Sequence, residues 1–375
     1  MARVLINMSS QPAGVPAGVA RFGMDLSRRL AERGSHDYVF RSQWSAGQLP
    51  PGLVANAELD VIPPLSSYFR EFGTQALLGS RHYPASRYDL VFNLDPLGMA
   101  SGGRSRMMIV HDIYYRSHGV YYAAMSGLKA RLQRAKQHAI HSAMIARSSL
   151  IVGISESTSA DVRRHFPSAA SRVRTILSDS TMGQVSPGML PDGLEPNRFF
   201  LAVANVTPNK NFGVLADAFG RLAADHPGIR LVHVGGDADE TFQKGLAIHG
   251  AADRLTRLRG IDDATLAALY RDALALVVPS LIEGFCLPVL EAQRLDCPVV
   301  FSNVSATGEI GGNGGIAFDP MDVDALETSM RRILREDGLR DAMRASGREN
   351  ALRFSWDRTV GEYETAIQDA LTREK

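Results

Sequence analysis

Cysteine, long apolar runs and an excess of either charge are scarce or missing in this chain of 375 residues. Its two cysteines, Cys286 and Cys297, are too few for a disulfide framework and fit a reducing compartment. No stretch approaches the roughly 18–20 apolar residues that a membrane-spanning helix needs. Lysine and arginine number 41 against 40 for aspartate and glutamate, so the overall charge gives no case for nucleic-acid binding.

The amino-terminal sequence MARVLINMSS also lacks the features of a signal peptide, since it has neither a long apolar region nor a small-residue cleavage site. It predicts a first buried strand instead. We therefore expect a cytoplasmic protein, with peripheral contact to the inner face of a membrane left open.

Short β-branched runs alternate with segments of helical period along most of the chain. Residues 18–33 place apolar side chains at helical spacing, and Gly34 follows as a stop signal. A strand–helix–strand order predicts parallel sheets that are covered by helices on both faces. The predicted strands are Arg3–Ile6, Leu90–Asn93, Met107–Val110, Leu150–Gly153, Phe199–Val203, Arg230–Val234, Ala275–Val278 and Val299–Phe301, and predicted helices include Asn211–Ala224, Ala264–Ala273 and Pro288–Leu295.

A segment rich in glycine and proline, residues 178–197, divides this pattern and is typical of a linker. We therefore predict an α/β protein with two Rossmann-like, doubly wound parallel-sheet domains, the first over 1–180 and the second over 181–355. A single large sheet is the alternative. Ligands of open α/β sheets bind at the carboxyl ends of strands, so two such domains facing a central cleft would place their strand-end loops on it.

The loop after the predicted strand Ala275–Val278 carries the densest set of candidate binding groups. Pro288 suits the first helical position, and the free amides before it, with the helix dipole, can bind an anion. Gly284 lets the backbone come close to a ligand. Glu283 and Glu291, with seven residues between them, suit hydrogen bonds from sugar hydroxyls at the two ends of a phosphate-bound ligand.

The run E-G-F-C-L-P-V-L-E-A of residues 283–292 resembles the Glu–seven–Glu motif of the retaining glycosyltransferases of family four, which have the GT-B fold. The resemblance implies two domains that face a central cleft, the first binding the acceptor and the second the donor, and a final segment, 356–375, that crosses back to the first. The other segments that resemble the family are 18–22, 111–112, 154–157, 205–211, 260–263, 302–305 and 318–320.

This resemblance assigns roles residue by residue. Glu291 would bind the ribose hydroxyls of a nucleotide-sugar, Lys210 would contact its diphosphate, and Glu283 would hold the donor sugar. Lys210, Glu283 and His111 form the predicted catalytic set. The other assigned positions are Gly18 and Asn205 near the phosphates, Arg259 along the base, His111 near the reacting carbon, and Gly284, Phe285, Cys286 and Leu287 around the sugar and diphosphate.

Stabilising a departing diphosphate requires positive charge, and Lys210 with a helix N-terminus would supply it without a metal. The alternative for Lys210 is a solvated lysine at a helix start, and for His111 a packed histidine that caps its loop. Asp237-Ala238-Asp239 spells the D-x-D that binds a divalent metal in other glycosyltransferases, but a solvated loop is the favoured interpretation. We predict no metal site and no cofactor besides the donor substrate.

Residues 113–155 form a second distinctive segment, with six lysines or arginines and no acid. A basic helix with tyrosines at its start suits an anionic membrane surface or a lipid-diphosphate acceptor, and an ordinary solvated helix face is the alternative.

The leading prediction is a retaining hexosyltransferase that acts on a hydroxyl of a glycan or of a polyprenyl-diphosphate-linked oligosaccharide. The resemblance implies a front-face course, in which the leaving phosphate helps to deprotonate the acceptor. GDP-mannose is the first donor choice, because the P-N-K-N and S-N-V-S segments resemble bacterial mannosyltransferases of surface-polysaccharide assembly. UDP-sugars are the alternative donors. A GT-B sugar-nucleotide epimerase and a non-catalytic sugar-nucleotide-binding scaffold are the alternative functions.

Overall fold

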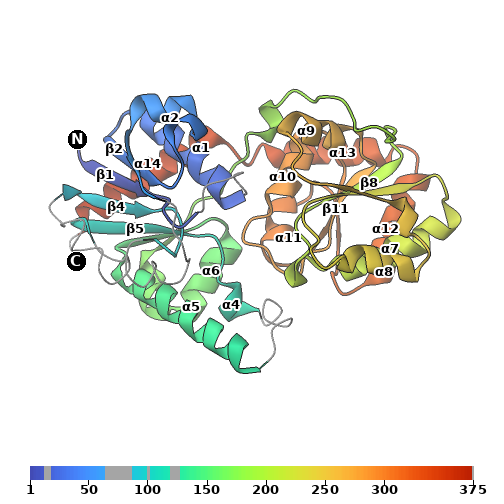
Figure 1. Cartoon of the computed structure of the whole chain (residues 1–375), viewed down its shortest axis with the longest axis horizontal. Helices are drawn as coiled ribbons and strands as arrows, with labels where there is room; N and C mark the ends of the chain where they lie inside the picture. Colours follow the sequence, from blue (N-terminus) through green and yellow to red (C-terminus); the bar gives the residue numbers. More distant parts are fainter. Residues whose placement is uncertain (12–17, 64–86, 99–101, 119–126, 374–375) are drawn as a thin grey trace. The chain divides into compact units, whose positions relative to one another are not determined.

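The computed structural model describes residues 1–11, 18–63, 87–98, 102–118 and 127–373, which form two parallel sheets with flanking helices (Figure 1). The chain divides into two compact units. One holds Met1–Ser117, Met125–Ser178 and Ser355–Lys375, and the other is built on Asp179–Phe354. The prediction of two doubly wound parallel sheets is confirmed, and the alternative of a single large sheet is wrong.

Seven parallel strands form the sheet of the first unit, in the order β3-β2-β1-β4-β5-β6-β7. The order reverses between β1 and β4, and ligands of such sheets bind in the crevice that this reversal leaves at the carboxyl ends. The strands are β1 (Arg3–Asn7), β2 (Asp37–Ser42), β3 (Glu58–Val61), β4 (Leu90–Asn93), β5 (Ser105–Val110), β6 (Leu150–Gly153) and β7 (Val173–Thr175).

Helix α14 (Trp356–Thr372) completes the first unit although it is the last helix of the chain. Trp356 stacks on Phe22 of α1 with ring centroids 5.7 Å apart, and Ser105 Oγ donates to the carbonyl oxygen of Ala370 at 2.6 Å. Tyr363 is fully buried. The other described α-helices of this unit are α1 (Gly18–Arg33), α2 (Pro51–Asn56), α4 (Tyr114–Ser117), α5 (Gly127–Arg147) and α6 (Glu156–His165).

Six parallel strands form the sheet of the second unit, in the order β10-β9-β8-β11-β12-β13. Here the order reverses between β8 and β11. The strands are β8 (Phe199–Val203), β9 (Arg230–Val234), β10 (Leu255–Leu258), β11 (Ala275–Val278), β12 (Val299–Ser302) and β13 (Ile316–Phe318).

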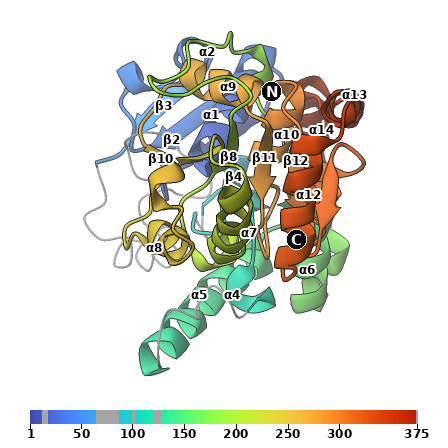
Figure 2. The ribbon, with the colours of Figure 1, turned by 90° about the vertical axis from the view of Figure 1, so that its right-hand side faces the viewer.

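Helices α7, α8 and α12 cover one face of this second sheet, and α9, α10 and α13 cover the other (Figures 1 and 2). The central strands β8, β11 and β12 are almost wholly apolar and buried, as expected for strands covered on both sides. The helices are α7 (Phe212–Asp225), α8 (Thr241–Ile248), α9 (Asp263–Asp272), α10 (Leu287–Arg294), α11 (Ser305–Gly311), α12 (Val323–Arg335) and α13 (Leu339–Ala351).

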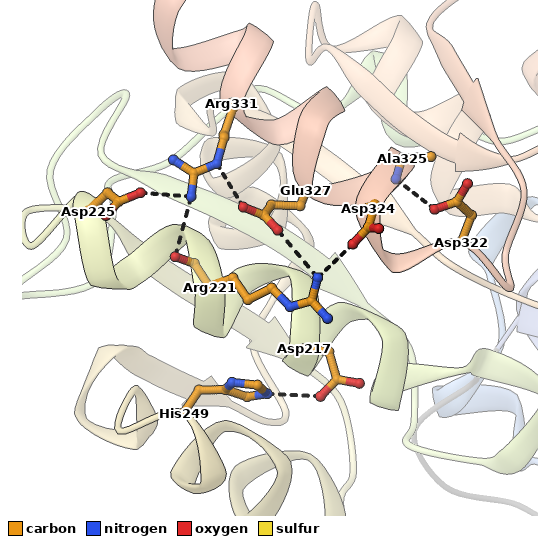
Figure 3. Close-up of polar contacts among 9 residues, drawn as sticks. All are labelled: Asp217, Arg221, Asp225, His249, Asp322, Asp324, Ala325, Glu327 and Arg331. Atoms are coloured by element: carbon orange, nitrogen blue, oxygen red, sulfur yellow. Dashed lines mark hydrogen bonds and ion pairs between the residues drawn. The ribbon is translucent and has the colours of Figure 1, made fainter.

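An ion-pair network joins α7 to α12 on the surface of the second unit (Figure 3). Arg331 contacts Asp225 and Glu327, each at 2.8 Å. Arg221 contacts Asp324 at 2.6 Å and Glu327 at 3.7 Å. Surface pairs contribute roughly 0–1 kcal/mol each, so the packing of these helices depends mainly on the apolar side chains beneath. The loops at the strand ends of this sheet therefore stand on a buried apolar core.

Candidate active site

Two loops meet at the point where the strand order of the second sheet reverses. One follows β8 and the other follows β11, and these strands are parallel neighbours. Three hydrogen bonds tie the loops together: Leu281 N donates to Asn209 O at 2.8 Å, Asn209 Nδ2 to Ile282 O at 3.4 Å, and Asn211 Nδ2 to Pro279 O at 3.1 Å. The pair therefore forms one platform at the edge where open sheets bind ligands.

Lys210 and Glu283 contact each other across this platform. Lys210 Nζ lies 2.5 Å from Glu283 Oε1, and the two side chains are 25% and 9% exposed. Ser280 Oγ donates to the same carboxylate oxygen at 2.7 Å, and Glu283 N donates to Ser305 Oγ at 3.0 Å. The structure thus brings together two of the three predicted catalytic residues, and Lys210 is not a simply solvated lysine.

The backbone at Cys286 adopts a conformation that favours glycine. Its φ is 81°, in the left-handed region, and it is the residue before α10. Leu287 rather than Pro288 is the first helical residue, so the predicted start of this helix was one residue late. Burial raises the pKa of the Cys286 thiol well above its usual range, which disfavours the reactive thiolate.

Glu291, in α10, is only 7% exposed. Ser180 Oγ donates to Glu291 Oε1 at 3.0 Å, and Tyr270 OH donates to Glu291 Oε2 at 3.0 Å. The second glutamate of the motif is therefore oriented by two protein hydroxyl groups.

The D-x-D segment is not a uniformly solvated loop, and this correction concerns Asp237. Asp237 is 2% exposed, and its carboxylate accepts hydrogen bonds from Thr241 N at 2.9 Å and Phe242 N at 3.2 Å at the start of α8. Its side chain thus caps a helix, whereas Asp239 is exposed. Within the described ranges, no group of three or more His, Cys, Asp or Glu side chains is arranged to hold a metal ion.

Arg259 lies next to this cap. Its Nη2 donates to the carbonyl oxygen of Asp237 at 3.1 Å, as does that of Arg257. A hollow of about 710 Å³ opens beside them, and Glu240 and Lys244 also line it. The side chain of Arg259 is therefore held at this hollow.

Asn205 joins two strand-end loops of the second sheet. Its Oδ1 accepts from Gly236 N at 2.7 Å, while Val206 N donates to Gly236 O at 2.6 Å. At the neighbouring Gly235, with a φ of 146°, a side chain would collide with Ala204 O. Asn205 thus holds the loop after β8 against the loop after β9.

In the first unit, His111 follows β5 and is half-buried. Its Nε2 lies 2.8 Å from Leu94 O, and its ring meets that of Phe22 edge-on with centroids 6.1 Å apart. Burial lowers the pKa of His111, so the ring is neutral at pH 7. Gly18 begins α1, and a side chain there would meet nothing within 4 Å.

Comparison with known proteins identifies this architecture. Residues 193–350 match the family described as "Glycosyl transferases group 1". The chain is 34% identical over 164 residues to the O-antigen chain mannosyltransferase B of Escherichia coli, a match that covers 42% of each chain. It is 25% identical to the D-inositol 3-phosphate glycosyltransferase of Thermobifida fusca, over 96% of this chain and 90% of that one.

Residues 193–350 of the chain belong to the group 1 glycosyltransferases. The resemblance to the family-four enzymes is thereby confirmed. Its fold is similar to that of a sucrose-phosphate synthase from Thermosynechococcus elongatus, with a TM-score of 0.73, 18% identity and 98% of both chains covered. This likeness confirms the GT-B fold.

Several groups of this glycosyltransferase that contact the predicted site were not predicted from its sequence. They are hydroxyl groups that act on the two motif glutamates, from Ser180, Tyr270 and Ser280. Ser180 lies in the predicted linker, where a serine gives no sign of contact with the motif. Tyr270 falls in a predicted helix, where an aromatic residue indicates packing rather than a polar contact.

In the parts of this glycosyltransferase that the structure describes, no helix is both long and apolar enough to span a bilayer. The basic segment contains α5, on which Leu128 and Leu132 are 71% and 61% exposed.

Proposed function

We propose that this glycosyltransferase moves a hexose from a nucleotide-sugar to a hydroxyl of a glycan or of a polyprenyl-diphosphate-linked oligosaccharide, with retention. The observation that carries this proposal is the contact between Lys210 and Glu283. It places a cation suited to a diphosphate and a carboxylate suited to a sugar at neighbouring strand ends. Two rigid loops hold both groups, so little reorganisation is needed when charge develops.

The second unit, built on residues 179–354, would bind the donor. Lys210 exchanges its contact with Glu283 for the diphosphate as the anion arrives, and Glu283 then accepts hydrogen bonds from the sugar hydroxyls. The amides of residues 284–287 face the diphosphate. Glu291 binds the ribose, and the base lies along Arg259 beside the adjoining hollow. Asn205 shapes the loop without adding charge.

The first unit, which holds residues 1–117, 125–178 and 355–375, would bind the acceptor. His111 is its contribution to the chemistry, because a neutral imidazole can hydrogen-bond a sugar hydroxyl as positive charge develops at the anomeric carbon. Gly18 leaves room for the donor phosphates. The departing phosphate deprotonates the acceptor hydroxyl, so no protein nucleophile is required.

GDP-mannose is the donor that we favour. The match to a mannosyltransferase of O-antigen assembly supports mannose as the sugar. Because that match covers 42% of the mannosyltransferase's length, it supports a donor class rather than an acceptor. UDP-sugars remain the alternative donors. For the acceptor, the exposed apolar and basic side chains of α5 favour a lipid-linked molecule at the inner membrane face.

A transfer assay tests the proposal. Purified full-length chain is incubated with GDP-mannose, UDP-glucose or UDP-galactose and a polyprenyl-diphosphate-linked mannose oligosaccharide, and product is followed by mass spectrometry and anomeric NMR. We expect acceptor-dependent release of GDP and an α-linked product from the α-linked donor. Activity should persist in EDTA, because Lys210 and the amides before α10 supply the charge stabilisation.

Three outcomes contradict the proposal. Conversion of the donor without acceptor would indicate an epimerase. Tight nucleotide binding without turnover of any donor would indicate a scaffold. Loss of activity in EDTA that manganese restores would show that a divalent metal supplies the charge instead of Lys210.

A further inference from the structure

The carboxylate of Glu291 is fixed from two sides before any ligand arrives. Ser180 Oγ donates to one oxygen and Tyr270 OH to the other, both at 3.0 Å. With one donor on each oxygen, the plane of the carboxylate is set by contacts that come from two different parts of the second unit. Each carboxylate oxygen can accept two hydrogen bonds, so a protein donor on an oxygen does not by itself prevent that oxygen from accepting from a ligand.

Tyr270, from α9, has no exposed surface. Leaving this buried hydroxyl without a hydrogen-bond partner would lower the stability of the folded protein by about 1–3 kcal/mol. The folded state therefore strongly favours the bond between Tyr270 and Glu291. Burial and the charge of Glu291 raise the pKa of Tyr270 well above its usual value. The hydroxyl therefore stays protonated and remains a donor across the pH range of any assay.

Ser180 is held in place by Arg294, which lies one turn beyond Glu291 on α10. Arg294 Nη2 contacts Asp179 Oδ1 at 2.6 Å, and its Nη1 donates to the carbonyl oxygen of Ser180. Met182 N donates to Ser180 Oγ at 3.2 Å. Because this hydroxyl accepts from Met182, its own hydrogen is directed at Glu291. The segment 179–182 is therefore built around the glutamate.

We propose that Ser180 and Tyr270 are positioning residues for donor recognition, which hold the Glu291 carboxylate in the orientation that accepts hydrogen bonds from the ribose hydroxyls. This inference rests on the proposed function, in which Glu291 binds the ribose. Neither residue touches the substrate, and their effect passes through Glu291 alone. Their removal should therefore weaken only the part of donor binding that depends on the ribose hydroxyls.

Isothermal titration of the full-length chain tests this dependence, with GDP and 2′,3′-dideoxy-GDP as probes and the corresponding UDP pair in parallel. Wild type should bind GDP at least roughly tenfold more tightly than the dideoxy form, as expected for two lost hydrogen bonds. Ser180→Ala and Tyr270→Phe should each weaken GDP binding by roughly 3- to 10-fold and leave dideoxy-GDP binding unchanged. In turnover, the donor KM should rise while kcat stays within about twofold. Ser180→Thr, which keeps the hydroxyl, should restore GDP affinity.

The controls remove buried hydroxyls from helices other than α9 and α10. Ser329→Ala, in α12, and Tyr363→Phe, in α14, should change neither affinity. Melting temperatures are measured for every variant, and Ser180→Ala carries the test alone if Tyr270→Phe fails to fold.

Equal weakening of GDP and dideoxy-GDP by Ser180→Ala would overturn the inference, because it would show a structural role only. Equal affinity of the wild-type chain for GDP and dideoxy-GDP would also overturn the inference, because the ribose hydroxyls would then contribute nothing to binding. If that chain still transferred the sugar, the proposed function would stand. A wild-type chain that neither binds a nucleoside diphosphate nor transfers a sugar would instead contradict the proposed function and the inference together.

Discussion

At the scale of single residues, truncation of Lys210 and truncation of Glu291 are expected to change different kinetic constants. Lys210→Ala removes charge stabilisation that grows as the diphosphate departs, so kcat should fall by roughly 10²- to 10³-fold. Glu291→Ala removes ribose contacts present in both the ground state and the transition state, so it should mainly raise the donor KM. Steady-state kinetics with varied donor measures both effects.

The control for Lys210→Ala is Arg358→Ala, which removes an exposed cation in α14. Because Glu283 would lose a partly buried ion-pair partner, unfolding of Lys210→Ala is measured in parallel. Near-wild-type kcat in folded Lys210→Ala would remove Lys210 from the diphosphate role.

Cys286 gives a second residue-scale prediction, on stability. A non-glycine residue at a φ of 81° is strained by roughly 1–2 kcal/mol. Cys286→Gly relieves this strain but loses a buried side chain, so the free energy of unfolding should stay within about 1 kcal/mol of wild type. Cys286→Val, which is β-branched, should lower it by about 2 kcal/mol or more. Urea denaturation checks both, and a valine variant as stable as wild type would contradict the argument.

The sequence predicts Lys210, Glu283 and Glu291 because their chemistry and spacing are local, and each lies in a recognisable loop or helix start. The groups that act on them are not local. Ser180 and Glu291 are 111 residues apart, and only the fold brings them together. Asp237 was misassigned for a similar reason, since a polar loop and a helix cap have the same composition.

At the scale of helices and strands, all eight predicted strands are present within a residue or two of their predicted bounds. These strands are apolar runs, mostly central in their sheets. Five others were missed: β2, β3, β7, β10 and β13. The edge strands β3, β7, β10 and β13 are only three or four residues long and partly exposed, so they show no apolar run. The missed strand β2 carries Arg41, which is buried against expectation.

Helix α5 packs on the first unit through His141. Because this imidazole is buried, we expect the free energy of unfolding to depend on pH. His141 is 4% exposed, and its ring meets Tyr115 edge-on with centroids 4.8 Å apart. Burial, with a smaller effect of nearby His138, lowers the pKa of His141 from 6.5 to about 4. The unfolded chain therefore binds a proton more readily than the folded chain between these values, and stability should fall as the pH falls from 7 to 5.

Replacement by a residue that does not titrate measures this effect. Between pH 7 and pH 5, His141→Gln should lose less stability than wild type, by about 1–2 kcal/mol. His249→Gln, in the second unit, serves as a control. Identical pH dependence in wild type and His141→Gln would show that the buried imidazole is not the group responsible.

The exposed side of α5 carries a separate prediction on membrane binding. Leu128 and Leu132 are one turn apart and exposed, and Arg131 is exposed beside them. Each basic residue near an anionic surface is worth about 1 kcal/mol, so binding should be measurable at low salt and weak at high salt. The combined change of Leu128→Ser, Leu132→Ser and Arg131→Gln should lower vesicle co-sedimentation at least tenfold.

Arg134 is left unchanged in that variant, because its Nε donates to the carbonyl oxygen of Tyr115 at 3.3 Å and its loss would disturb packing. Leu352→Ser, an exposed leucine in the second unit, is the matched control. Vesicles of phosphatidylglycerol and phosphatidylcholine are compared. If wild type does not bind the anionic vesicles, or the triple variant binds them equally, α5 is an ordinary solvated helix and a soluble glycan is the better acceptor.

At the scale of the whole molecule, the chain leaves its first unit near Ser178 and returns to it at Ser355, so that α14 belongs to a core assembled from both ends of the sequence. Trp356, Tyr363 and Ile367 are all at most 5% exposed. Burying three such side chains stabilises a fold by about 6 kcal/mol, which is comparable with the whole stability of an ordinary domain. A chain that ends at Phe354 should therefore lose its first unit at assay temperature.

The second unit should survive that truncation, because its sheet, its helices and the contacts of Ser180 and Tyr270 with Glu291 all lie between Asp179 and Phe354. Limited proteolysis of the 1–354 chain should digest the first unit and leave a resistant fragment over residues 179–354, whose melting temperature GDP still raises. The 1–372 chain, which keeps all of α14, should behave as wild type. Resistance of the first unit in the 1–354 chain would show that α14 only covers a core that is stable without it. Loss of GDP binding from the resistant fragment would instead show that donor recognition needs groups of the first unit, with Gly18 and His111 the first candidates.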